Sequence, residues 1–90
     1  MLYMVLEKFK DGNAVEVYRR FRNKGRMTPA GVMYVASWVD KDLKQCFQLM
    51  EADNENLLAE WTANWKDIVD YEIHPVMSSD EALEKISPHL

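Results

Sequence analysis

Residues 31–52 (GVMYVASWVDKDLKQCFQLMEA) contain two runs of strand-forming residues separated by a short polar segment. The runs, Val32–Val39 and Lys44–Glu51, are rich in the β-branched, aromatic and apolar residues that favour strands. The segment Asp40–Leu43 has turn chemistry and folds one run back on the other. The sequence therefore predicts a β-hairpin, which the remaining residues must cover.

The flanking segments have the patterns of further strands and helices. Asn13 and Gly25 bracket the first expected helix as N-cap and stop signal, Asp53 or Asn54 caps the second, and Pro75 favours an edge position for the last strand. We expect strands at Met1–Phe9, Val32–Val39, Lys44–Glu51 and Ile68–Val76, and helices at Ala14–Lys24, from residue 53 or 54 to about Lys66, and at Asp80–Ile86.

This order, β-α-β-β-α-β with a short C-terminal helix, predicts a single α+β domain over residues 1–90 with the ferredoxin-like plait. In that topology the first and third strands are central, and both main helices cover one face of the sheet. A 90-residue domain buries only about two-thirds of the surface of its unfolded chain, which favours a homodimer.

Residue alternation along the strands divides the sheet into two faces. The aliphatic set is assigned to the helix-covered face: Leu2, Met4, Leu6, Met33, Val35, Val39, Phe47, Leu49, Tyr71 and Ile73. The opposite set is more aromatic and polar, and two such faces packed together would form a dimeric α/β barrel with a polar-lined interior. This assignment requires a three- or five-residue loop, or a bulge. A strict four-residue loop at Asp40–Leu43 places Trp38 on the face of Phe47.

The face away from the helices is the predicted ligand pocket. Tyr34 and Trp38 would supply apolar walls, and Gln48 and His74 would supply hydrogen bonds to a small organic ligand. The remaining members of this candidate site are Cys46, Glu7 and Glu72. The same side chains could instead fill the interior of the dimer, and the two interpretations have similar weight.

Catalytic and metal chemistry have weaker support. Cys46 and His74 would lie about 9–10 Å apart across the intervening strand, so an inert thiol is favoured over a nucleophile. His74 stays a candidate general base for a cofactor-free enzyme, and a dimer with a structural or regulatory role is a third hypothesis. No metal site and no cofactor are expected.

Charge and hydropathy limit the partners that we expect. The basic run on and just after the first helix (Arg19, Arg20, Arg22, Lys24 and Arg26) is interpreted as a solvated surface. Arg26, which follows the stop signal Gly25, is the one that could turn towards a pocket mouth. The net charge of −4 argues against nucleic acid, and no apolar run approaches the length of a membrane span. The single cysteine fits a reducing compartment, so we expect a cytoplasmic protein.

Five segments resemble a small bacterial family. They are VYRRFRNKGRM (Val17–Met27), SWV (Ser37–Val39), CFQLMEA (Cys46–Ala52), the pair Trp61 and Trp65, and HPVMSSDEA (His74–Ala82). The chain resembles the domain-of-unknown-function family 3303 (DUF3303) over nearly its whole length. The resemblance implies a place near the dimeric α/β-barrel proteins, which include cofactor-independent monooxygenases and muconolactone-isomerase-like enzymes. It brings no catalytic residues and no established activity.

Overall fold

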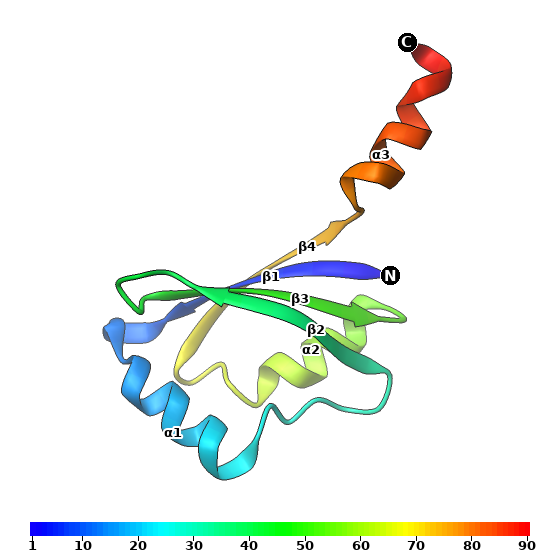
Figure 1. Ribbon diagram of the computed structural model, residues 1–90. Helices are drawn as coiled ribbons and strands as arrows, with labels where there is room; N and C mark the ends of the chain where they lie inside the picture. Colours follow the sequence, from blue (N-terminus) through cyan, green and yellow to red (C-terminus); the bar gives the residue numbers. More distant parts are fainter.

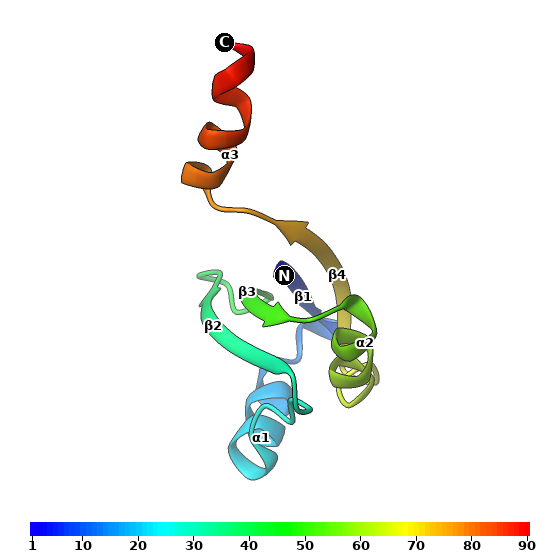
Figure 2. The ribbon, with the colours of Figure 1, turned by 90° about the vertical axis from the view of Figure 1, so that its right-hand side faces the viewer.

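The computed structural model describes residues 1–90, which form one four-stranded antiparallel sheet with two helices packed on one face (Figures 1 and 2). The elements, in order, are β1 (Leu2–Phe9), η1 (Lys10–Gly12), α1 (Ala14–Lys24), β2 (Val32–Val39), β3 (Gln45–Ala52), α2 (Glu55–Ala63), β4 (Val69–Val76), α3 (Ser79–Ile86) and η2 (Ser87–His89).

The strand order is β2-β3-β1-β4, with β1 and β3 central, as the plait topology predicts. The ferredoxin-like α+β fold is thus confirmed. Pro75 lies on β4, which is an edge strand with a neighbouring strand on one side only. A proline, which has no backbone N–H, is tolerated at such an edge. The only notable boundary difference is at α2, which ends at Ala63 rather than near Lys66.

Side-chain caps start all three α-helices. The side chains of Asn13, Asn54 and Ser78 accept hydrogen bonds from the backbone N–H three residues further on, at 3.1–3.2 Å. Each cap satisfies one of the N–H groups that the first helical turn leaves free. The local sequence therefore determines where each helix begins, independently of the packing.

The predicted assignment of the two sheet faces is wrong for most of the residues in it. Trp38 lies directly opposite Phe47, and Val39 lies opposite Cys46. The turn has four residues between Asp40 and Gln45, whose backbones hydrogen-bond at 3.0 Å, and this even number keeps Trp38 and Phe47 on one face. A β-bulge does occur, but at residue 35 in the middle of β2, where the pairing shifts between Tyr34 and Ala36.

As a consequence, the polar and aromatic set lies largely beneath the helices. Glu7, Cys46 and Gln48 are buried together with Tyr3 and Val5, and they face α1 and α2. The open face carries most of the aliphatic set instead, together with Trp38: Leu2, Met4, Leu6, Met33, Phe47 and Leu49. Of that aliphatic set, Val39, Tyr71 and Ile73 do lie on the helix-covered side.

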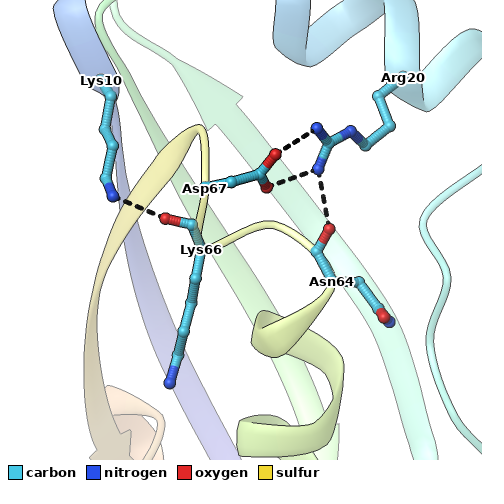
Figure 3. A network of polar contacts seen from close by, with 5 residues as sticks. All are labelled: Lys10, Arg20, Asn64, Lys66 and Asp67. Atoms are coloured by element: carbon cyan, nitrogen blue, oxygen red, sulfur yellow. Dashed lines mark hydrogen bonds and ion pairs between the residues drawn. The ribbon is translucent and has the colours of Figure 1, made fainter.

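A bidentate ion pair joins α1 to the loop before β4 (Figure 3). Both terminal nitrogens of Arg20 contact the carboxylate of Asp67 at 2.7 Å, and Nη1 also donates to the backbone oxygen of Asn64. Lys10 donates to the backbone oxygen of Lys66 on the other side of the same loop. These contacts hold α1 against the segment that carries Trp65, and so fix one wall of the space between helices and sheet.

The C-terminal helix α3 projects away from the sheet and from both other helices (Figure 1). Every residue from Met77 to Leu90 is exposed, including Leu83 and Ile86 on the apolar side of α3. The radius of gyration is 14.8 Å, against about 12 Å for a compact 90-residue domain. No helix has the length and apolar character needed to cross a membrane.

Candidate functional site

A cavity of about 120 Å³ lies between the sheet and the two covering helices. Its lining is mainly aromatic and aliphatic, with a few polar groups at one side. The lining residues are Glu7, Phe9, Val17, Tyr18, Phe21, Arg26, Ser37, Val39, Cys46, Gln48, Trp61, Trp65 and Tyr71. An apolar concave space with a small number of convergent polar groups is the usual form of a small-molecule site.

Three polar side chains form a chain of hydrogen bonds along this cavity. The Nε of Arg26 donates to Oε1 of Gln48 at 2.7 Å, and Nε2 of Gln48 donates to the carboxylate of Glu7. Gln48 on β3 and Glu7 on β1 are 4% and 7% exposed. Because Gln48 uses its acceptor for Arg26 and a donor for Glu7, its amide orientation is fixed by the two charged groups.

Arg26 reaches the cavity because its backbone and its side chain are both held. The indole N–H groups of Trp61 and Trp65 both donate to the backbone oxygen of Arg26, at 3.0 and 3.1 Å. Its guanidinium stacks over the ring of Tyr34, 3.7 Å from the ring centroid, with Phe21 on another side at 5.1 Å. This stacking places a cation over two electron-rich ring faces and fixes the plane of the guanidinium.

The bulge on β2 places Tyr34 and Ser37 on the same side of the strand. Without it, residues three apart would point to opposite faces. Their hydroxyl groups are hydrogen-bonded to each other at 2.8 Å. Ser37 therefore lines the cavity while Tyr34 supports Arg26 beside it.

The cavity shifts the acidity of the groups that line it. Burial raises the pKa of Glu7 from 4.5 to about 7, and the hydrogen bond from Gln48 and the charge of Arg26 only partly oppose this effect. Burial also raises the pKa of the Cys46 thiol to about 12, with the nearby Glu7 charge adding to it. Glu7 can thus gain or lose a proton near neutral pH, whereas burial holds Cys46 as the thiol, its less nucleophilic form.

The seven predicted site residues divide between the two faces. Glu7, Cys46 and Gln48 line the cavity, and Tyr34 lies beneath Arg26 at its edge. Glu72, His74 and Trp38 lie on the open face, so the pocket predicted there is not assembled. His74 is hydrogen-bonded to Glu72 at 3.0 Å, on the opposite side of the sheet from Cys46, and no Cys–His pair forms.

Several cavity residues lay outside the predicted site. Trp61 and Trp65 carry a helical spacing that predicts core, and they are buried, but nothing in that spacing predicts a shared hydrogen-bond acceptor. Tyr18 and Phe21 lie on the apolar stripe of α1 and close the cavity from the helix side. Arg26 follows the helix stop Gly25, and the expectation that it turns towards a pocket mouth is confirmed.

No group of three or more His, Cys, Asp or Glu side chains lies close enough together to hold a metal ion. The polar groups of the cavity are instead one carboxyl, one amide, one guanidinium, one thiol, three hydroxyls from a serine and two tyrosines, and two indole N–H groups. This set can donate and accept hydrogen bonds and can transfer a proton through Glu7.

The fold and the cavity together define an α+β plait domain with an internal polar-apolar pocket. The profile of the family described as "Domain of unknown function (DUF3303)" matches residues 1–90, and the chain belongs to this family. The resemblance seen in the sequence is thereby confirmed. No curated protein matches the chain.

Proposed function

We propose that the protein binds a small organic molecule of about one ring in the cavity between the sheet and the helices. The buried chain from Arg26 through Gln48 to Glu7, which opens onto an aromatic cavity, carries this proposal. A core built only for stability would favour apolar groups here, because well-packed apolar side chains are often as stable as a buried polar network or more so. The helix-covered face replaces the open face as the location of the site.

The size of the cavity limits the ligand. An engineered apolar cavity of about 150 Å³ in another protein accommodates benzene, and a cavity of about 120 Å³ with a polar edge suits a molecule of similar size. The rings of Phe21, Trp61 and Tyr71 would pack against it, and Gln48 or Glu7 would bond its polar substituent.

Thermal shift with single-ring probes such as phenol and benzyl alcohol tests this proposal. A ligand at about 100 times its Kd adds about 2.7 kcal/mol, which raises Tm by roughly 10 °C or more in a domain of this size. Val17→Phe should fill the cavity and remove the shift, because Val17 lines it. Val15→Phe is the matched control on the exposed side of the same helix. Equal shifts in both variants, or no shift with any probe, would contradict the proposal.

A second candidate function is a cofactor-free enzyme of the isomerase type, favoured by the position and acidity of Glu7. Its carboxylate would take a proton from a carbon next to a carbonyl group and return it at another carbon, with no co-reactant. With a pKa of about 7, Glu7 exists in both protonation states near neutral pH. Exchange of such protons with deuterated water, followed by NMR and lost in Glu7→Gln, tests this function. His74 lies outside the cavity and has no part in it.

We further propose that the protein is a homodimer in which a second copy covers the open face. The accessible surface of one chain is 6243 Å², whereas a compact monomer of 10.6 kDa has about 5,500 Å². The excess is close to the roughly 800 Å² that each partner buries in a standard interface. Trp38, 57% exposed, lies beside Phe47 on the open face, among exposed apolar side chains of the kind that mark interfaces.

In this dimer α3 of each subunit would pack against the other, since its apolar side has no partner in its own chain. The interface would be mainly apolar over β1, β2 and β3, with Glu72 and His74 as polar groups on β4. Sedimentation equilibrium should give a dimer for the natural chain and a monomer for Trp38→Asp. Val15→Asp, an equally exposed position on α1, should leave the dimer intact. A monomeric natural chain would contradict the proposal.

If sedimentation shows a dimer and no probe binds, these results would favour a structural or regulatory role without a ligand. We also propose that the protein is cytoplasmic, because its one free cysteine, which is buried, would stay reduced there.

A further inference from the structure

Arg26 is the only cationic side chain that lines the cavity. The four ion pairs of the structure involve Lys10, Arg19, Arg20 and His74, so no carboxylate lies within 4.0 Å of the Arg26 guanidinium. Its nearest acidic group, Glu7, is reached only through the amide of Gln48. The positive charge at the cavity therefore forms no direct ion pair within the chain.

The donors of Arg26 are also only partly used. Nε bonds to Gln48, and neither Nη1 nor Nη2 has an acceptor within the protein. By contrast, both Nη atoms of Arg20 are engaged by Asp67. Stacking on Tyr34 and the bond to Gln48 hold the guanidinium of Arg26 in one plane, which leaves the donor pair of its outer edge preorganised.

We propose that the ligand of the cavity is a single-ring compound that carries a carboxylate, bound end-on by Nη1 and Nη2 of Arg26. This inference rests on the proposed function and adds the chemical class of the ligand. The two terminal N–H groups of a guanidinium match the two oxygens of a carboxylate, and such bidentate bonds are stronger than neutral ones. The ring would then lie among the aromatic side chains beyond Phe21.

The neighbouring acid favours a monoanion over a more highly charged group. Glu7 lies at the other end of the same hydrogen-bond chain, and when ionised it adds negative charge to the cavity. A phosphate ester would bring a second negative charge into that space. A carboxylate is also planar, so its two oxygens can lie in the plane of the guanidinium and accept from both terminal nitrogens.

Calorimetric titration with benzoate, benzyl alcohol and phenyl phosphate distinguishes these ligand classes. The natural chain should bind benzoate about tenfold to a hundredfold more tightly than benzyl alcohol, the range expected for hydrogen bonds to a charged group. Phenyl phosphate should bind more weakly than benzoate. Arg26→Gln should remove the preference for the carboxylate, so that benzoate binds no more tightly than benzyl alcohol does to the same variant.

Two further variants complete the test. Arg22→Gln removes an exposed arginine from the end of α1 and should leave benzoate binding as it is. Arg26→Lys keeps the positive charge but cannot form two parallel hydrogen bonds to a carboxylate, so it should retain only part of the preference for benzoate over benzyl alcohol. This variant replaces Arg26→Gln in the test if Arg26→Gln fails to fold. Benzyl alcohol binding as tightly as benzoate would overturn this inference and leave the proposed function standing. Absence of binding by all three probes would overturn both.

Discussion

Trp61 and Trp65 donate their indole N–H groups to one and the same acceptor, the backbone oxygen of Arg26. The two residues are also buried core, at 1% and 5% exposure. They therefore stabilise the domain by burial and at the same time fix the loop residue that supplies the charge of the cavity. Stability and site geometry are linked through this one carbonyl group.

The shared acceptor predicts non-additive effects of removing the two donors. Trp61→Phe and Trp65→Phe should each cost about 1–3 kcal/mol, since the other indole still satisfies the carbonyl group. The double variant removes both donors of this part-buried carbonyl group and should cost about 1 kcal/mol more than the sum. Urea unfolding of the four proteins measures this coupling energy, and simple additivity would refute it.

Gln48→Leu should break the hydrogen-bond chain at its centre. Glu7 and Arg26 would both lose a partner, so the variant should be less stable by about 1–3 kcal/mol. The pKa of Glu7 should rise further above its usual range, because the bond from Gln48 lowers it. Denaturant unfolding and an NMR titration of the Glu7 carboxyl carbon test the two effects. Gln45→Leu, on the same strand but facing the open side, is the matched control and should change neither.

Glu7 predicts how stability depends on pH. Its pKa is raised from 4.5 to about 7 in the folded protein, so the folded state holds its proton more tightly than the unfolded chain. This contribution is complete below pH 4.5 and is lost as the pH rises through 7, an effect of about 3 kcal/mol at most. Glu7→Gln should remove the decline and be more stable than the natural chain at pH 8.

The groups around Glu7 do not obscure this effect. Gln48 does not titrate, and burial raises the pKa values of Cys46, Tyr18 and Tyr71 further from neutrality. Asp67 titrates elsewhere, because the hydrogen bond from Arg20 lowers its pKa to about 2. Its contribution is present above pH 3.8 and is lost as the pH falls towards 2, in both proteins. If Glu7→Gln keeps the decline between pH 5 and 8, another group is responsible.

Cys46 should be unreactive while the protein is folded. Burial raises the pKa of its thiol to about 12, so almost none is the reactive thiolate at pH 7.5. A disulfide reagent should modify it only at the rate of opening or unfolding, and denaturant should accelerate the reaction to that of a free thiol. Rapid modification of the native protein would contradict the burial of Cys46.

Periodicity and capping were sufficient to predict the elements, but not the faces of the sheet. The signals for Asn13, Pro75 and the two tryptophans are local, and each acts as expected. Which residues face the helices depends on the number of residues in the turn between Asp40 and Gln45 and on a bulge at Val35. The sequence does not decide between the two faces, because both sets of alternating residues are apolar enough to form a core. Alternation predicts Glu7 and Gln48 on the face away from the helices, yet they are buried beneath the helices, where they hydrogen-bond to each other.

The position of Arg26 illustrates what a local pattern does not contain. Its neighbours in the sequence predict only the end of a helix. Its role comes from residues on β2, on β3, on α2 and in the turn just after α2, which the fold brings to it from 8 to 39 positions away along the chain. Such a site is visible only once the packing of helices on the sheet is known.

The projecting helix α3 has a consequence for how the chain folds. It has eight residues, and isolated helices shorter than about 12–15 residues are marginal in water. Its helical state therefore depends on an apolar surface, which in the proposed dimer only a second chain provides. Folding of the tail and assembly become a single event whose midpoint shifts with protein concentration. Amide exchange in Ser79–Ile86 should accelerate on dilution while that of β1 and β3 stays slow.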